Sequence, residues 1–158
     1  MSEKFSRTEL LIGQDAMIKL ASCRVAVFGV GGVGGYVVEA LARSGIGELD
    51  LIDNDVVSES NINRQIIATT KTVGMPKVEV AKNRILEINP EIKVNVYQIF
   101  YTPETAGMFD FSKYDYVVDA IDTVVGKLQL IEEAKKYNVS VICAMGAGNK
   151  LNPALFEV

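Results

Sequence analysis

Residues 29–34 read Gly29-Val30-Gly31-Gly32-Val33-Gly34, directly after the apolar run Val25-Ala26-Val27-Phe28. Glycines at this spacing, between a buried strand and the start of a helix, are typical of a phosphate-binding turn. The first glycine permits the tight turn, the second lets backbone amides approach a phosphate, and the third allows the helix to pack closely on the strand. The amino end of that helix favours an anion. The alternative is a tight turn that binds no ligand.

A carboxylate follows the second predicted strand. Asp53 lies about 20 residues beyond the glycine turn, where Rossmann domains carry the acidic residue that binds ribose hydroxyls. Together, the turn and this carboxylate predict a nucleotide-binding domain. They do not select the nucleotide, because domains that bind NAD, FAD or ATP share this strand, turn and helix.

Apolar runs of strand length alternate with helical patterns along the chain. This alternation indicates βαβ units, so we predict a Rossmann-like α/β fold with a mostly parallel sheet flanked by helices on both faces. The strands are expected at Arg24–Gly29, Glu48–Ile52, Val94–Phe100, Tyr116–Ala120 and Ser140–Ala144. The helices are expected at Glu9–Leu20, Gly34–Arg43, Pro76–Ile88 and Val125–Tyr137.

The composition indicates one compact domain. Of the 158 residues, 49% are hydrophobic, which is enough apolar material for a core. No apolar run approaches the roughly 20 residues that cross a bilayer, and the amino terminus has no signal-peptide pattern. We therefore expect a cytoplasmic protein without a membrane partner, with one domain over residues 1–158. Pro153–Val158 read as the beginning of a strand, so the chain is expected to be the amino-terminal part of a longer protein.

The chain contains no histidine, which excludes Ser-His-Asp triads, Cys-His pairs and histidine-ligated zinc within it. Its two cysteines, Cys23 and Cys143, adjoin or lie in apolar runs, where a reduced cysteine usually acts as a small hydrophobe. The net charge of −4 gives no general electrostatic reason to bind nucleic acid. Any catalysis must come from Lys, Arg, Asp, Asn and backbone groups.

Cations and amides gather after the second predicted strand. Asn61, Arg64 and Gln65 lie in one short segment, and Lys77 lies at the start of the third predicted helix. A triphosphate needs such groups, because Arg gives forked hydrogen bonds and Lys a mobile charge, whereas a dinucleotide dehydrogenase has no evident need for them here. The pattern favours ATP over NAD. The alternatives are that Asn61 and Arg64 tie down a loop and that Lys77 is solvated.

A further carboxylate follows the fourth predicted strand. Asp122, in Asp119-Ala120-Ile121-Asp122, lies at the carboxyl edge of the sheet, where open α/β sheets bind ligands. A carboxylate there is suited to hold Mg²⁺ against phosphate oxygens. The alternative is a helix cap before Thr123, since Asp is a preferred N-cap residue.

Taken in order, these motifs resemble the adenylation domain of the ubiquitin-activating-enzyme superfamily, the ThiF-like proteins. The similarity spans nearly the whole chain and includes Gly-x-Gly-Gly-x-Gly, Leu-Ile-Asp-x-Asp, Ser-x-x-Asn-Arg-Gln, Gly-x-Pro-Lys, Ile-Asn-Pro and Asp-Ala-Ile-Asp. Within the superfamily, residues 42–47, 61–65 and 145–151 resemble the tRNA threonylcarbamoyladenosine dehydratase branch most closely. The chain lacks the Cys-x-x-Cys pairs with which sulfur-carrier activators bind zinc.

The resemblance implies an enzyme that uses ATP to adenylate a carboxylate. In the dehydratase branch this carboxylate belongs to threonylcarbamoyl on a tRNA adenosine, and ring closure with loss of water follows. In the alternative it is the C-terminus of a ubiquitin-like sulfur-carrier protein of molybdopterin or thiamine synthesis, with a sulfur-transfer protein as a further partner. An NAD-binding oxidoreductase domain and a non-catalytic scaffold subunit are the remaining alternatives.

The resemblance also implies which residues form the site. The residues implied to bind the nucleotide are Gly29, Gly31, Gly32, Gly34, Asp53, Asp55, Asn61, Arg64, Gln65 and Lys77. The residues implied to be catalytic are Arg64, Lys77, Asp122 and Arg7, with Asp122 holding Mg²⁺. Arg7 matches an arginine that superfamily members insert into the ATP site of a neighbouring subunit, so a homodimer is implied. The alternative for Arg7 is an ordinary surface residue.

Overall fold

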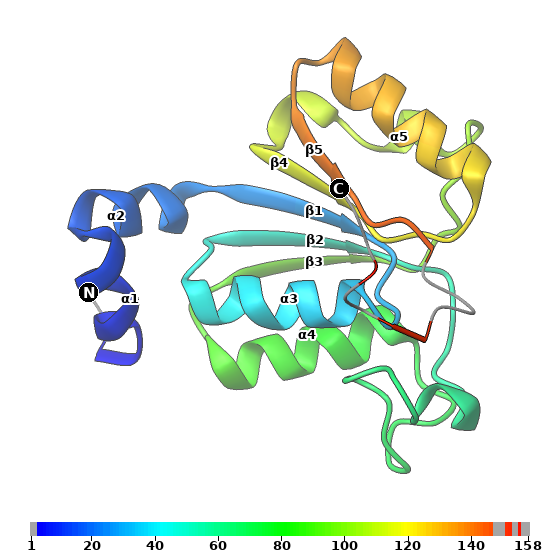
Figure 1. Cartoon of the computed structure of the whole chain (residues 1–158), viewed down its shortest axis with the longest axis horizontal. Helices are drawn as coiled ribbons and strands as arrows, with labels where there is room; N and C mark the ends of the chain where they lie inside the picture. The colour runs from blue at the N-terminus through cyan, green and yellow to red at the C-terminus, as the bar shows by residue number, and fades with distance from the viewer. Residues whose placement is uncertain (1–2, 147–150, 153–154, 156–158) are drawn as a thin grey trace.

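The computed structural model of the chain describes residues 3–146, 151–152 and 155. Its centre is a five-stranded parallel sheet with the strand order β3-β2-β1-β4-β5 (Figure 1). The strands are β1 (Arg24–Phe28), β2 (Glu48–Ile52), β3 (Lys93–Tyr97), β4 (Tyr116–Asp119) and β5 (Ser140–Cys143). The α-helices are α1 (Ser6–Ile12), α2 (Gln14–Ser22), α3 (Gly34–Ser44), α4 (Lys77–Ile88) and α5 (Val124–Lys136). The Rossmann-like prediction is confirmed.

Side chains alternate between the two faces of each strand, so β1 contributes to two cores. Val25 and Val27 face a core that α3 and α4 cover, whereas Ala26 and Phe28 face a second core that α5 covers. Figure 1 shows α3 and α4 on one side of the sheet and α5 on the other. None of these four side chains is more than 4% exposed, so β1 is the buried central strand.

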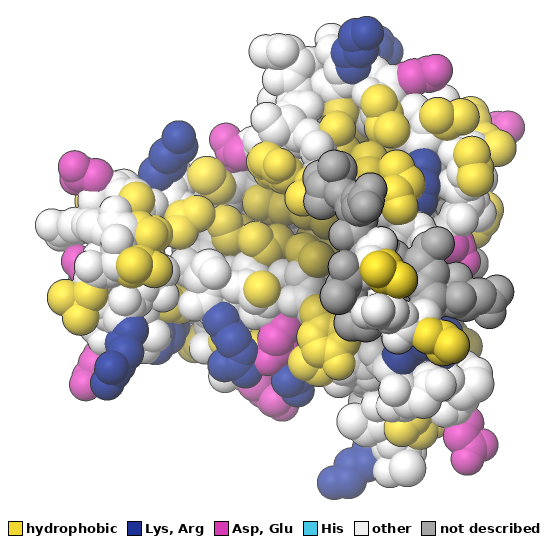
Figure 2. Space-filling view, in the orientation of Figure 1, with side chains coloured by type: hydrophobic (Ala, Val, Ile, Leu, Met, Phe, Trp, Pro, Cys, Tyr) yellow, Lys and Arg dark blue, Asp and Glu magenta, His cyan; other side chains and the backbone are white. Residues whose placement is uncertain are grey.

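One half of a sheet face is open among the described residues. Tyr116 and Ile142 lie on the same side of β4 and β5 as the buried Val118, and they are 39% and 56% exposed. Figure 2 shows hydrophobic side chains gathered over the strands in a hollow between the amino-terminal helices and α5. The helices α3 and α4 pack on β1, β2 and β3 instead.

The prediction of one opening helix over Glu9–Leu20 is wrong, because the chain breaks at Gly13 into α1 and α2. Gly13 has φ 84° and ψ 163°, a backbone region that is essentially restricted to glycine. The helical spacing of apolar residues continues across this break, so the pattern alone conceals it. None of the helices in the described part of the chain is long and apolar enough to span a membrane.

The third strand also differs from its prediction. β3 ends at Tyr97 rather than Phe100, because its neighbour β2 ends at Ile52, which is the register partner of Tyr97. The apolar residues that follow have no strand to pair with. The other strands and the helices α3, α4 and α5 end within about one residue of their predicted limits, the usual uncertainty of such boundaries. The strand predicted to begin in Pro153–Val158 lies outside the described residues apart from Leu155.

The turn between β1 and α3 depends on two glycines. Gly29 has φ 89°, and a Cβ added to it would lie 2.6 Å from the carbonyl oxygen of Ala120. A Cβ on Gly34 would collide with the carbonyl oxygen of Gly29. The first residue of α3 therefore packs directly on the end of β1, and the turn lies beside the segment that leaves β4.

We predict that Gly34→Ala lowers the free energy of unfolding by about 3 kcal/mol or more, because backbone rather than a flexible side chain must move. The stabilisation of about 1 kcal/mol that alanine brings to a helix is too small to offset this clash. Urea denaturation measures the change. The matched control is Gly107→Ala, where an added Cβ meets nothing within 4 Å. Equal stability of the two variants would contradict the close packing.

Candidate functional site

A cavity of about 740 Å³ opens at the carboxyl ends of β1, β2 and β4. It collects the residues predicted to bind a nucleotide, with the exception of Gly34, which packs inside the turn. The predicted residues that line it are Gly29, Gly31, Gly32, Asp53, Asp55, Asn61, Arg64, Gln65, Lys77 and Asp122. Residues from five separate parts of the chain therefore meet at one edge of the sheet.

The glycine turn lies open to this cavity. A Cβ added to Gly31 would lie 3.7 Å from Gln65 Nε2, and one added to Gly32 would lie 3.6 Å from Arg64 Cγ. The segment that carries Arg64 and Gln65 thus folds over the turn. A cationic side chain and the amino end of α3 border the same space, which suits a phosphate.

Asp53 fixes the turn to the loop that follows β2. Its Oδ2 accepts a hydrogen bond of 2.7 Å from the N–H of Val30, and its Oδ1 accepts one of 2.9 Å from the N–H of Asp55. Each carboxylate oxygen has a second acceptor site. Asp53 can therefore hold the turn and still accept hydrogen bonds from ribose hydroxyls.

Lys77 is buried, so the interpretation of a solvated lysine is wrong. Its side chain is 6% exposed, and its Nζ lies 2.7 Å from Oδ2 of Asp55, whose side chain is 56% exposed. The N–H of Lys77 also donates to the carbonyl oxygen of Asp55, at 3.0 Å. The ammonium group is thus kept at the wall of the cavity by a carboxylate that water can reach. Asp55 positions the lysine in this structure.

Asn61 and Arg64 have local partners as well as places in the cavity wall. Oδ1 of the buried Asn61 accepts a hydrogen bond of 2.9 Å from the N–H of Ser58. Nη1 of Arg64 donates to the carbonyl oxygen of Ser60 at 3.1 Å and to Oδ1 of Asn63 at 3.0 Å. Asn61 and Arg64 therefore do hold their loop in place, as the alternative interpretation stated. Both side chains also border the cavity, so they remain available to bind a nucleotide.

Gln65 carries a polar atom without a partner. It is 6% exposed, and among the described residues its buried Oε1 has no hydrogen bond. An unpaired buried amide oxygen costs about 1–3 kcal/mol. The other end of the same amide, Nε2, lies beside Gly31, where Gln65 lines the cavity.

Asp122 is exposed and lines the cavity. It does not cap α5, because the N-cap residue is Thr123 and no side chain caps this helix. Among the described residues, no three His, Cys, Asp or Glu side chains gather into a metal cage. A divalent cation at Asp122 would therefore take its other ligands from phosphates and water, which is the usual arrangement for Mg²⁺.

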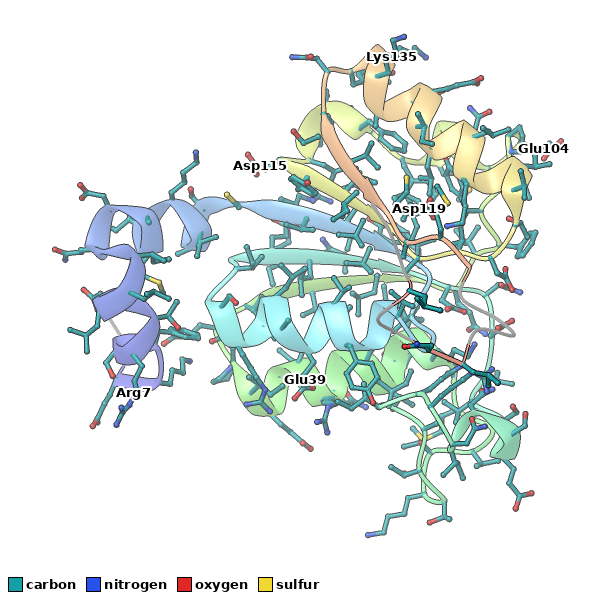
Figure 3. The ribbon with its side chains drawn as sticks, viewed as in Figure 1. Arg7, Glu39, Glu104, Asp115, Asp119 and Lys135 are labelled. Atoms are coloured by element: carbon teal, nitrogen blue, oxygen red, sulfur yellow. The ribbon has the colours of Figure 1, made fainter. Side chains whose placement is uncertain are left out.

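Arg7 does not join the site of its own chain. It is an exposed residue of α1 and does not line the cavity. Figure 3 shows Arg7 on the amino-terminal helices and Asp119 at the opposite end of the sheet. Within one copy of the chain, the arrangement agrees with an ordinary surface arginine.

The sequence and the fold place this site in a known group of proteins. The model of the ThiF family matches residues 5–156. The chain belongs to the ThiF family. The family prediction made from the motifs is therefore confirmed.

Relatives of this ThiF-family chain include several named enzymes. The chain is 47% identical over 158 residues to the tRNA threonylcarbamoyladenosine dehydratase of Bacillus subtilis, covering 100% of the chain and 62% of that protein. A crystal structure of the Escherichia coli tRNA N6-threonylcarbamoyladenosine dehydratase in complex with ATP has a TM-score of 0.92 at 41% identity, with 96% of this chain and 63% of that one covered. The chain also resembles the adenylyltransferase and sulfurtransferase UBA4 of Vanderwaltozyma polyspora, 36% identical over 138 residues, or 87% of this chain and 31% of that protein.

The chain spans about three fifths of the length of the dehydratases it matches, since it covers 62%, 60% and 58% of those from Bacillus subtilis, Haemophilus influenzae and Escherichia coli. The similarity to the dehydratase branch therefore concerns this ThiF domain.

Two features of the site in this ThiF-family chain escaped the sequence analysis. Ile99, Phe100 and Ile121 give the cavity an apolar wall that suits a flat base. The only signal was the apolar run that continues beyond the third strand. The second feature is the buried pair of Asp119 and Lys127, whose Nζ lies 3.1 Å from both carboxylate oxygens. A lysine in the first turn of a helix, where the helix dipole disfavours it, was the available signal.

The two cysteines agree with the structural interpretation. Cys23 and Cys143 are half-buried free thiols. Burial raises the pKa of both thiols, and for Cys143 a hydrogen bond with the Asp119 carboxylate raises the pKa further. A raised pKa keeps the sulfur protonated at neutral pH, which disfavours a nucleophilic role.

We predict that Lys77→Met leaves the free energy of unfolding unchanged or raises it by about 1 kcal/mol. The substitution removes a buried charge and keeps the apolar stem, while Asp55 can be solvated because it is more than half exposed. Urea denaturation beside the control Lys82→Met, on the same helix, measures this. A loss of about 2 kcal/mol or more at Lys77 alone would show that the buried lysine serves stability.

Proposed function

We propose that this chain is the ATP-binding domain of an enzyme that adenylates a carboxylate. The proposal rests on one observation: the buried Lys77 borders a cavity that Arg64 and the glycine turn also line. Burial of a cation costs free energy, and a triphosphate would give this lysine a binding role. The crystal structure of the Escherichia coli relative in complex with ATP supports the proposal.

In the proposed reaction, a carboxylate oxygen of the substrate attacks the α-phosphorus of ATP. The bond from this phosphorus to the bridging oxygen breaks, which gives an acyl adenylate and pyrophosphate. Lys77 and Arg64 neutralise the charge that develops on pyrophosphate, and the backbone of the glycine turn holds the phosphates. Positioning and electrostatics carry the rate, so the absence of histidine from the sequence is no obstacle.

We assign the remaining nucleotide contacts by the chemistry of each side chain. Asp53 accepts from the ribose hydroxyls, and the apolar wall beside Phe100 receives the base. Asn61 and Gln65 hydrogen-bond the nucleotide from the segment above the turn. Asp122 holds Mg²⁺, which supplies Lewis-acid stabilisation of the phosphate oxygens when it is bound.

The substrate we propose is threonylcarbamoyladenosine in tRNA. Similarity to named dehydratases over 99–100% of this chain supports it. The carboxylate of the threonylcarbamoyl group is adenylated, an internal nitrogen or oxygen then displaces AMP, and the ring closes with net loss of one water. The second candidate is the C-terminal carboxylate of a ubiquitin-like carrier protein, which the 36% identity to an adenylyltransferase and sulfurtransferase favours.

Arg7 is part of the proposal only in a dimer. On the exposed face of α1 it is available to a second copy of the chain, so we propose a homodimer in which it reaches the partner's triphosphate. A cytoplasmic location, residues 1–158 as a single adenylation domain at the amino end of a longer protein, and a sulfur-transfer partner stay predictions from the sequence.

We predict that the chain binds ATP in the presence of Mg²⁺ and does not bind NAD at equal concentration. Lys77→Met and Asp122→Asn should each weaken ATP binding about tenfold or more, since each removes a charged contact worth about 1.5–3 kcal/mol. Isothermal titration calorimetry measures both affinities, with Lys82→Met as the control. Tighter binding of NAD, or normal ATP binding by both site variants, would overturn the site assignment.

The substrate is tested by mass spectrometry of tRNA nucleosides. We expect that incubating the protein at its natural length with ATP and tRNA carrying threonylcarbamoyladenosine makes this nucleoside lighter by one water. The control reaction omits ATP. An unchanged nucleoside, together with an adenylated terminus on a ubiquitin-like carrier, would favour the second candidate.

A further inference from the structure

We propose that Lys127 is a positioning residue for the metal-binding side of the site. Through Asp119, it fixes the turn that presents Asp122 to the cavity. This inference rests on the proposed function, because it assigns a purpose to the placement of Asp122. It concerns a buried ion pair that does not itself line the cavity.

The contacts of Asp119 reach the residue directly before Asp122. Asp119 is the last residue of β4 and is 0% exposed. Its Oδ1 accepts a hydrogen bond of 3.2 Å from the N–H of Ile121, and the N–H of Ala120 donates to the carbonyl oxygen of Phe28 at 2.8 Å. Both peptide groups between the strand and Asp122 are thus held. One of them is held by a side chain rather than by the sheet.

Lys127 holds that side chain in place. Its Nζ lies 3.1 Å from each Asp119 carboxylate oxygen and donates a hydrogen bond of 2.7 Å to the carbonyl oxygen of Ala144. An ammonium group has three donors, so all three are used. Lys127 belongs to the first turns of α5, and Ala144 follows β5 directly. One side chain therefore joins the end of β4, the start of α5 and the end of β5, near the position of Asp119 in Figure 3.

A second observation shows how closely α5 packs against the segment between β4 and α5. A Cβ added to Gly126 would lie 2.6 Å from Ile121 Cδ1 and 2.8 Å from Thr123 Oγ1. Ile121 and Thr123 flank Asp122 and line the cavity. The ion pair thus holds this segment at Ile121, and the backbone of α5 packs against Ile121 and Thr123.

Stability alone does not explain an ion pair at this place. The 12% exposed lysine lies near the amino end of a helix, where the dipole disfavours a cation, and burial of both charges removes them from water. Apolar side chains of similar volume would often stabilise such a place as well. An ion pair with fixed geometry can instead set the position of a neighbour. Mg²⁺ requires near-ideal octahedral geometry, so a small displacement of Asp122 would weaken its binding.

The test is a double variant, Lys127→Met with Asp119→Leu. Both partners are replaced by apolar groups of similar shape, so no unpaired charge stays buried. Calorimetry gives the ATP dissociation constant in Mg²⁺ and in EDTA, and the ratio of the two isolates the contribution of the metal. We expect the double variant to bind ATP in EDTA within about twofold of wild type. The gain from Mg²⁺, the factor by which it tightens ATP binding, should fall about tenfold, as it does when outer-shell residues of metal sites are substituted. Lys127→Arg, which keeps the charge, should retain most of that gain.

The matched control is Arg24→Met with Asp50→Leu. This pair joins a 0% exposed aspartate to an arginine at 2.8 Å, at the opposite end of β1. It should leave the response to Mg²⁺ unchanged. An unchanged ratio in the Lys127 double variant, or an equal fall in the control, overturns the proposal, because the pair then serves stability only.

Two further results separate this inference from the proposed function. Asp122→Asn should abolish the gain from Mg²⁺, and if it does not, the assignment of Asp122 fails and the positioning role fails with it. If Asp122→Asn loses the gain while the double variant keeps it, only the inference about Lys127 fails. Should the double variant not fold, Asp119→Asn replaces it, with the same expected loss and the same contradiction by an unchanged ratio.

Discussion

The site depends on the contact between the glycine turn and the two strands beside β1. Gly34 lies against the carbonyl oxygen of Gly29, and Gly29 lies against Ala120 at the end of β4. On the other side, Asp53 at the end of β2 accepts the N–H of Val30. Because β1 is central, this single turn brings the ends of its two neighbours within reach of one ligand. A side chain at Gly29 or Gly34 would separate them.

Several polar groups at this edge of the sheet carry a free-energy cost. Lys77 and the pair of Asp119 and Lys127 bury charge, and the amide oxygen of Gln65 is buried without a partner among the described residues. Such groups usually gather where binding or catalysis requires them, because proteins tolerate local instability at functional sites. Lys77 and Gln65 line one cavity. The pair of Asp119 and Lys127 lies beside the segment that leads to Asp122, so these costly groups gather at one site.

The sequence predicted the sheet well because each strand carries a short apolar run, most clearly the buried central strand β1. The sequence prediction failed where the apolar pattern of one segment does not show which other segments it pairs or packs with. Apolar spacing continues through Gly13, and the run up to Phe100 extends past the end of the neighbouring strand. Both differences come from backbone conformation and pairing, which a single segment does not encode.

The sequence predicted which residues form the site, but it did not predict the contacts between them. The motifs named the residues of the cavity, but they did not reveal that Lys77 is buried against Asp55 or that Thr123 rather than Asp122 precedes α5 as its cap. Lys127 was missed because its spacing suits an ordinary helix. These facts depend on contacts between residues far apart in the chain.

A crystal structure of the chain with Mg²⁺ and a non-hydrolysable ATP analogue would show most directly whether this edge of the sheet binds a triphosphate. We expect the phosphates over the glycine turn, with Lys77 Nζ within about 3 Å of a phosphate oxygen, the distance of a charge-assisted hydrogen bond. Phosphates bound elsewhere, with Lys77 still paired only to Asp55, would contradict the claim that this edge of the sheet is built to hold a triphosphate.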